Sequence, residues 1–218
     1  PAGGASVDMY NVAVGYDAGK LVTTGIRNTL TGTNAGDNIT EGDDNIAIGF
    51  HALSAVTTTD DSIAIGTYAG SSSTTNIVAI GRSAGGTNSS GTGNTAVGHN
   101  ALNANAVGDN NTAVGYTALF TMNPADGTSG NTAVGFQSGY AINSGLYNTV
   151  IGANAGDALT TGDNNIIIGY NAAASAVGVD NEITLGDANI SAFRCNDQSI
   201  AALSDGRDKK EVEQLSLG

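Results

Sequence analysis

The phrase Asn-Thr-Ala-Val-Gly occurs three times without change, at Asn94–Gly98, Asn111–Gly115 and Asn131–Gly135. Looser copies begin at Asn11, Asn28, Asn45, Ser62, Ile77, Asn148, Asn165 and Glu182. The glycines that end these phrases stand at positions 15, 32, 49, 66, 81, 98, 115, 135, 152, 169 and 186. Eight of the ten intervals between successive glycines are therefore equal to 17, and the other two are 15 and 20. Such regularity predicts a stack of equivalent structural units.

The residues of each phrase predict a short β-strand. In Asn111–Gly115, Thr112 and Val114 point to one side while Asn111 and Ala113 point to the other, which is the period of a strand. The glycine supplies a backbone geometry suited to a corner, and the small residue three positions later, usually alanine, allows neighbouring coils to approach closely. We expect each coil to hold two short strands and two corners. Asp and Asn in the Gly-Asp-Asn stretches should form turns by bonding their own backbone.

Together these features predict an all-β fold, a repetitive parallel β-roll or β-solenoid of about eleven 17-residue coils. Coils stacked at the inter-strand spacing would form a rod roughly 50 Å long. Only 5% of the 218 residues are aromatic, and Trp is absent, so stacking alone leaves a thin core. We infer that several chains associate around an axis, because association would bury the missing apolar surface.

The composition also excludes several classes of function. A formal net charge of −13 disfavours binding to nucleic acid or to an anionic membrane surface. No apolar run is long enough to predict membrane insertion. The single cysteine, Cys195, excludes an intrachain disulfide framework. Paired acidic turns such as Asp43-Asp44 and Asp60-Asp61 lack the spacing of known calcium loops, so the sequence predicts no metal site and no cofactor.

The repeat resembles those in the heads of bacterial trimeric autotransporter adhesins, which are left-handed parallel β-rolls assembled three to a head, and similar repeats occur in bacteriophage tail fibres. After the repeats, Ser204–Leu215 resembles the opening of the endosialidase-type intramolecular chaperone of phage tailspikes and fibres, with the pattern S-D-x-R-x-K-x-x-[IV]-x-x-[IL]. The resemblance implies a homotrimer. It divides the chain into a lead-in from a longer chain (1–10), a repeat domain (11–190), a connector (191–203) and a truncated chaperone (204–218) with a short helical start.

The chaperone family trimerises its fibre and then cuts itself off at the serine. Carried over to this chain, Ser204 would be the nucleophile or the cleavage-point residue, Lys209 would assist it, and Asp205 would complete the local geometry. A nearby lysine can activate a hydroxyl group when it is desolvated. The alternative is that Ser204 and Asp205 merely cap a helix that begins near Gly206. Apart from this single-turnover step, no enzyme activity is expected.

Two sets of residues are candidates for recognition. Aromatic residues follow the repeat glycine at Tyr16, Phe50, Tyr116, Phe136 and Tyr170, with His99 in the same position; this column is either a structural ladder or a strip for stacking sugars. The 20-residue interval predicts an enlarged loop, and loops on one face of a solenoid often bind ligands. The receptor-binding candidates in this loop and the next are Phe120, Met122, Asn123, Asp126, Tyr140 and Tyr147. Alternatively, Phe120 and Met122 fill a gap between coils.

The expected function is that of a virion structural protein, a distal tail-fibre segment that attaches to the host cell surface. Its partners would be two further copies of the chain, other tail proteins, and a host surface glycan or outer-membrane protein. Two alternatives remain open: the head of a bacterial trimeric adhesin, located at the cell surface, and a glycan-depolymerising tailspike.

Overall fold

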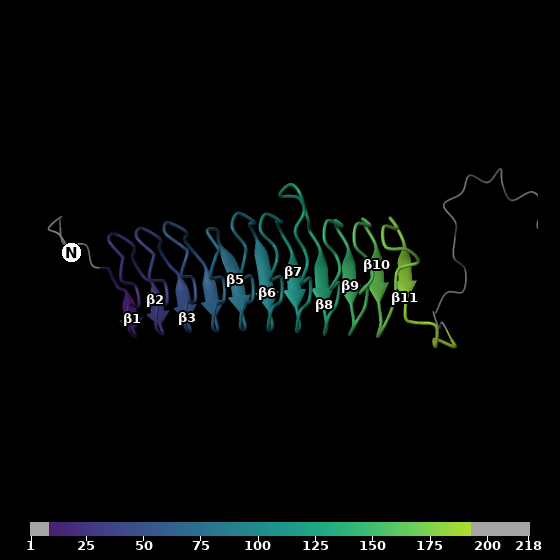
Figure 1. Cartoon of the computed structure of the whole chain (residues 1–218), viewed down its shortest axis with the longest axis horizontal. Coiled ribbons are helices and arrows are strands. Elements are labelled where there is room, and N and C mark those ends of the chain that lie inside the picture. Colours follow the sequence, from purple (N-terminus) through teal and green to yellow (C-terminus); the bar gives the residue numbers. More distant parts are fainter. Residues whose placement is uncertain (1–8, 193–218) are drawn as a thin grey trace, which may run out of the picture. The chain divides into compact units, whose positions relative to one another are not determined.

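The computed structural model describes residues 9–192, and each of the eleven repeat phrases forms one short strand. The strands are β1 (Val12–Val14), β2 (Thr29–Thr31), β3 (Ile46–Ile48), β4 (Ile63–Ile65), β5 (Ile77–Ile80), β6 (Asn94–Val97), β7 (Thr112–Val114), β8 (Thr132–Val134), β9 (Thr149–Ile151), β10 (Ile166–Ile168) and β11 (Ile183–Leu185). They pair in sequence order in one parallel sheet (Figure 1). The predicted all-β, parallel solenoid is confirmed.

The sheet keeps one register along its whole length. Thr95 pairs with Thr112 and Val97 with Val114 across a 17-residue interval. The same alignment holds across the 15-residue interval, where Ile63 pairs with Val78, and across the 20-residue interval, where Thr112 pairs with Thr132. The loops therefore absorb every difference in coil length, and the strands do not shift.

The predicted alternation of side chains is also confirmed. Asn111 and Ala113 are completely buried, whereas Thr112 and Val114 are half-buried on the outer face of the sheet. Alanine three residues after the repeat glycine is buried in most coils, as at Ala101 and Ala118. These small residues and a row of leucines form a narrow continuous core.

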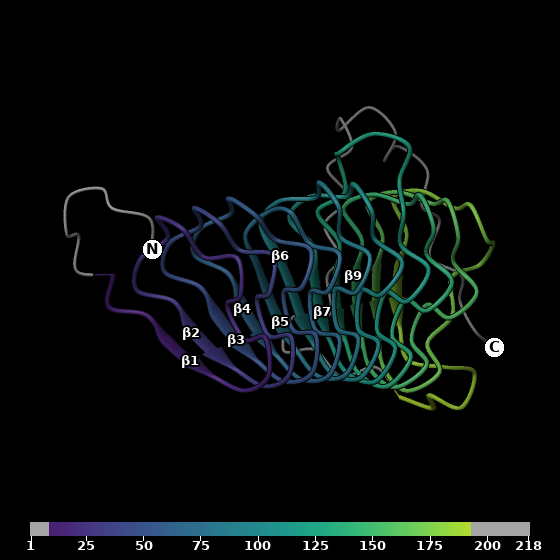
Figure 2. The same ribbon diagram turned by 60° about the vertical axis from the view of Figure 1, so that its left-hand side comes forward.

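The expectation of two strands per coil is wrong, because the side opposite the sheet contains turns only (Figure 2). After Gly98, every second residue has a positive φ: 133° at Gly98, 56° at Asn100 and 50° at Leu102. A strand requires negative φ at each residue, so this alternation cannot form a second sheet. Hydrogen bonds still connect the coils on this side; the N–H of Leu102 donates to Ala118 O at 2.9 Å.

The repeat glycines are required by both conformation and space. Gly32 has a φ of 132°, which side chains rarely adopt, and it lies directly against the next repeat glycine. A Cβ atom at Gly32 would lie 2.7 Å from the carbonyl oxygen of Gly49. The corner of each coil can therefore stack on the backbone of the next only when its own residue is glycine.

Buried asparagines form a ladder through the rod. The side-chain amide of Asn148 donates to Gly162 O at 2.7 Å, and its Oδ1 atom accepts the backbone N–H of Asn165 at 2.9 Å. Asn165 repeats this arrangement in its own coil, where its Oδ1 atom accepts the N–H of Glu182 at 2.8 Å. Each ladder residue thus satisfies buried backbone groups in the neighbouring coil.

The aspartates that precede the ladder also bond between coils. The Oδ1 atom of Asp43 accepts the N–H of Ile26 at 2.8 Å, and that of Asp163 accepts the N–H of Leu146 at 2.8 Å. The expectation that the Gly-Asp-Asn stretches bond their own backbone is wrong at Asp163, whose carboxylate accepts this bond from another coil. In a solenoid, the backbone of the adjacent coil lies closer in space than a local turn partner.

The predicted lead-in up to residue 8 lies outside the described residues, and so do the predicted helical start and the residues of the chaperone resemblance.

Replacing one rung of the asparagine ladder should destabilise the rod strongly. Asn148→Ala leaves the Gly162 carbonyl group and the Asn165 N–H without partners in a buried environment, and each orphaned group costs about 1–3 kcal/mol. We expect a loss of about 3 kcal/mol in chemical denaturation. The exposed Asn143→Ala in the same coil is the control; an equal effect of both substitutions would contradict the ladder's importance.

Replacing a residue with a strained backbone conformation should have the opposite effect and stabilise the protein. Thr117 has a φ of 50°, although it is β-branched, and its buried Oγ1 atom has no hydrogen-bond partner within residues 9–192. The preceding coil carries Asn100 at this position, with a φ of 56°. Because Asn tolerates this conformation, Thr117→Asn should stabilise the protein by about 1 kcal/mol in thermal denaturation.

The reverse change, Asn100→Thr, should destabilise the protein by a similar amount. If the two substitutions shift the melting temperature in the same direction, the strain at Thr117 is not what limits stability.

Candidate functional site

The enlarged coil projects from the rod between β7 and β8 (Figure 1). Asn123 and Asp126 are exposed, while Pro124 and Ser129 are buried at the base of the loop. The N–H of Asp109 in the preceding coil donates to Gly127 O at 2.7 Å, which attaches the loop to its neighbour.

Met122 lies in the core and is not available to a receptor in this structure. Its side chain is completely buried, and its sulfur accepts a hydrogen bond from the Asn131 side-chain amide at 3.4 Å. Met122 stands seven residues after its repeat glycine, the position that Ile142 fills in the next coil. It fills the core between coils, which is the alternative that the sequence left open.

Phe120 and Tyr140 form a stacked pair beside the enlarged loop. Their ring centroids are 5.3 Å apart with an interplanar angle of 3°, and both side chains are half-buried. They stand five residues after their glycines, where the flanking coils carry Asn103 and Asp157. The pair is a short aromatic platform between an amide and a carboxylate group.

Tyr147 belongs to a different surface. It stands twelve residues after its glycine, immediately before the ladder residue that leads into β9, and 56% of its surface is exposed. Its ring lies over Gly130, where an added Cβ atom would come within 3.0 Å of Tyr147 Cδ1. No ring contact joins Tyr147 to Tyr140 in the described part of the chain. The structure therefore does not gather all the predicted receptor residues into one site.

The aromatic column after the repeat glycine is continuous over only part of the rod. His99 and Tyr116 have ring centroids 5.2 Å apart, and Tyr116 stacks on Phe136 at 5.4 Å. Arg82 extends this series, since its Nε atom lies 2.9 Å from His99 Nε2. Elsewhere Thr33, Thr67 and Ala153 interrupt the column. The side chains from Arg82 to Phe136 therefore contact one another from coil to coil, and the rings of Tyr116 and Phe136 also remain exposed.

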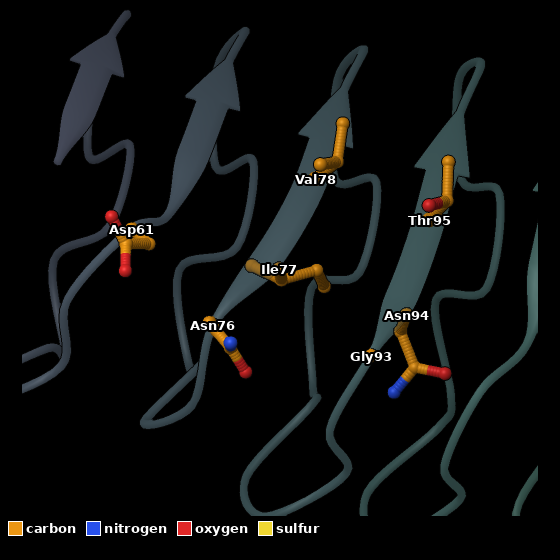
Figure 3. Close-up of a pocket in the computed structure, with 7 residues that line it drawn as sticks. All are labelled: Asp61, Asn76, Ile77, Val78, Gly93, Asn94 and Thr95. Carbon is orange, nitrogen blue, oxygen red and sulfur yellow. The ribbon is translucent and has the colours of Figure 1, made fainter.

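A second irregularity forms a hollow that the sequence reasoning missed. The coil between Gly66 and Gly81, here called the short coil, corresponds to the 15-residue interval. A hollow of about 210 Å³ opens beside it at the start of β5 and β6 (Figure 3). It is lined by Asp61, Asn76, Ile77, Val78, Gly93, Asn94 and Thr95. The 15-residue interval could have predicted this hollow, because a shortened coil leaves space at the surface just as an insertion adds a loop.

A second hollow of about 430 Å³ adjoins the first and shares Asp61 and Asn76 with it. It adds the residues Thr58, Thr59, Asp60, Thr74, Thr75 and Thr92. Threonine hydroxyl groups thus surround one carboxylate pair and one carboxamide group. The two hollows form one open depression on the rod, which we call the short-coil groove.

The charged side chains near the groove are mostly carboxylates, and one of these carboxylates is paired with an arginine. Arg27 pairs with Asp44 at 2.6 Å. The hydrogen bond between them raises the pKa of Arg27 and lowers the pKa of Asp44. Asp61, one coil beyond Asp44, forms no ion pair in the described structure. It therefore contributes a carboxylate without a direct ion-pair partner to the groove, although its charge helps to raise the pKa of Arg27.

The predicted cleavage residues Ser204, Asp205 and Lys209 lie outside the described residues. Within residues 9–192, no group of three or more His, Cys, Asp or Glu side chains is arranged to hold a metal ion. The same residues contain no helix of the length and apolar character needed to cross a membrane.

Comparisons with protein-family models, with curated proteins and with solved structures return no match to this chain. What the chain does is therefore inferred from its own residues.

A double-mutant cycle can separate the two interpretations of the Phe120–Tyr140 pair. If the stacked rings pack between coils to stabilise the rod, Phe120→Leu and Tyr140→Leu should couple by about 0.5–1.5 kcal/mol in denaturation experiments. Coupling near zero would show that the stack adds nothing to stability, and would favour a role in binding.

Proposed function

We propose that this chain is the rod of a homotrimeric fibre that attaches to a host cell surface, namely a distal tail-fibre segment of a virion. The observation that supports the proposal is an apolar stripe on the outer face of the sheet. In every coil, the residue immediately before the repeat glycine points outward from this face. We call these residues the outer stripe: Val14, Thr31, Ile48, Ile65, Ile80, Val97, Val114, Val134, Ile151, Ile168 and Leu185.

The outer stripe is apolar at every rung except Thr31, although its side chains are in contact with solvent in one chain. Ile48, Ile65 and Ile80 are each 37% exposed, and Leu185 is 47% exposed. The parallel register places these residues in one line along a rod of roughly 50 Å. Soluble monomers rarely expose a contiguous apolar surface of this kind, so it favours association.

The neighbouring outward positions are uncharged as well. The first outward residue of each strand, such as Thr112 in β7 or Ile63 in β4, is Thr, Val or Ile throughout. Neither outward column contains a charged residue, although the whole chain carries a net charge of −13. A face without charge on an acidic rod would allow copies to pack without bringing like charges together.

The number of copies and the biological setting rest on resemblance. The repeats resemble those of trimeric adhesin heads and phage fibres, and Ser204–Leu215 resembles the start of a chaperone that trimerises phage fibres. Three stiff rods packed side by side would suit attachment, because three copies of each surface loop would engage a glycan or outer-membrane protein together. Ser204, Asp205 and Lys209 would serve one self-cleavage during maturation and no other catalysis.

Charged substitutions on the outer stripe test the assembly. Ile65→Glu and Val134→Glu should dissociate the fibre, because each places three carboxylates in a desolvated contact. Both positions are 37% exposed in one chain, so the coil itself should remain folded. Sedimentation equilibrium should give three times the chain mass for the unmodified protein and a reduced mass for the variants.

Ala158→Glu, at an exposed turn position away from the sheet, is the matched control and should leave the trimer intact. A monomeric unmodified protein, or stripe variants that assemble normally, would count against the proposed interface.

The alternative that the chain is a glycan-depolymerising tailspike can be tested by looking for shortened polysaccharide. Incubation with host surface polysaccharide should leave the chain length unchanged if the fibre only attaches, and shorten it if the fibre is an enzyme. Size-exclusion chromatography of the polysaccharide distinguishes these outcomes.

A further inference from the structure

We propose that the short-coil groove binds one unit of a neutral saccharide, with Asp61, Asn76 and Gly93 as its principal hydrogen-bonding residues. This inference rests on the proposed function, because it assigns a ligand class and a place to the attachment surface. The groove lies at the start of β5 and β6, at the opposite end of the strands from the outer stripe (Figure 3).

The groove exists because one column of the rod is interrupted there. In most coils the residue just before the ladder position occupies a left-handed conformation, with φ of 59° at Asp44, 57° at Asp61 and 58° at Asn110. Asn76 in the short coil does not adopt a positive φ, and Gly93 in the next coil has no side chain. At Asn76 and Gly93, two consecutive positions of this column, the surface of the rod is therefore left uncovered.

The same interruption leaves backbone donors unpaired. Elsewhere this column bonds to the preceding coil: Asp61 N–H donates to Asp43 O at 3.1 Å, and Asn110 N–H donates to Thr92 O at 2.8 Å. No such inter-coil hydrogen bond forms at Asn76 or Gly93 among the described residues. Their two N–H groups remain as free donors beside the groove.

Side-chain groups beside these donors are unpaired as well. Asp44 is paired with Arg27, and the Asn164 side chain donates to Asn181 at 2.8 Å. By contrast, within residues 9–192 the side chains of Asp61 and Asn76 form no hydrogen bond. The groove therefore presents a carboxylate acceptor, a carboxamide that both donates and accepts, and two backbone donors.

This set of groups matches a sugar better than other ligands. An anion would be repelled by Asp61 and by Asp60 in the adjoining hollow. A divalent cation would need more than these carboxylates, and it cannot use the N–H donors. Hydroxyl groups of a sugar can both donate to Asp61 and accept from the two N–H groups. The half-buried Val78 at the groove would contact the apolar C–H face of the ring.

The first hollow of the groove has room for one sugar unit. Its volume of about 210 Å³ is less than the roughly 300–1,000 Å³ of sites that enclose drug-sized ligands. The adjoining hollow, lined by threonine hydroxyls, would take the continuation of a longer glycan. An open site of this size should bind a monosaccharide with a Kd on the order of 1 mM or weaker, and several copies on a fibre would raise the avidity.

Saturation-transfer NMR with D-glucose, D-galactose, D-mannose and N-acetyl-D-glucosamine tests the proposal on the full chain. At least one sugar should receive saturation from the protein. Asp61→Gly removes the carboxylate and retains a residue suited to a φ of 57°, and it should weaken binding about tenfold. Gly93→Asn should abolish binding, because its side chain fills the groove.

The Gly93→Asn substitution is compatible with the fold. Gly93 has a φ of 67°, which Asn tolerates. An added Cβ atom would clash only with the Oδ1 atom of the Asn110 side chain, at 2.6 Å, and would be in ordinary contact with Asn110 Cα at 3.8 Å. The matched control is Asn164→Gly, which lies in the same column four rungs beyond Gly93, has a φ of 55°, and should bind sugar as the unmodified protein does. Circular dichroism establishes that each variant keeps its sheet.

Absence of saturation transfer to all four sugars would overturn the proposal, and so would undiminished binding by both Asp61→Gly and Gly93→Asn. Sedimentation of the same samples distinguishes the failures. A trimer without sugar binding leaves the proposed fibre intact and removes this site, whereas a monomer that binds sugar contradicts the fibre and retains the site.

Discussion

The fold depends on a buried hydrogen-bond ladder that connects each coil to the next. A carboxamide group is suited to this position because it accepts through Oδ1 and donates through Nδ2 at the same time. Asn131 uses both functions: Nδ2 donates to Gly145 O at 2.8 Å, and Oδ1 accepts the N–H of Asn148 at 2.9 Å. The same bond to the next coil forms across the 20-residue interval, where Asn111 Oδ1 accepts the N–H of Asn131 at 3.1 Å, so the ladder fixes the register and tolerates changes in coil length. A core made largely of alanine could not impose that register, because alanines offer no shape that distinguishes one alignment from another.

The ladder is interrupted where the short coil lies, and a second polar row replaces it. Ser62 and Ile77 stand at ladder positions and have no carboxamide. Seven residues after the glycine, the core changes from Ile39 and Val56 to the buried residues Ser73, Asn88 and Asn105. The Asn88 Oδ1 atom accepts from the Nδ2 atoms of Asn94 at 3.3 Å and Asn105 at 3.1 Å. This cluster restores side-chain bonding between coils just beyond the break. Burying these polar side chains costs free energy, which is offset because each of the three amides forms hydrogen bonds.

Much of this architecture could be predicted from the sequence, since it repeats. The spacing of the glycines located all eleven strands, and the alternation in Asn111–Gly115 identified the buried face. The missing second strand could not be predicted, because Leu102 and Leu119 adopt φ of 50° and 48° against their own preference. Inter-coil hydrogen bonds hold them there, and such bonds are not visible in single residues. The place of Met122 was left open for a related reason: its spacing matches that of Ile142, but burial at this position depends on the turns of the coil, which the structure shows.

The constant register also explains where recognition can arise. Ile63 pairs with Val78 across the shortest interval and Thr112 with Thr132 across the longest, so changes in coil length leave the sheet undisturbed. The outer stripe therefore remains straight, and an interface along it tolerates length changes elsewhere in the coil. Insertion produces a projecting loop, as at Asn123 and Asp126, and deletion produces a groove, as at Asn76. Deletion is the more favourable way to build a small binding site. It exposes backbone donors that the rigid neighbouring coils already hold in place, so little conformational entropy is lost when a ligand binds.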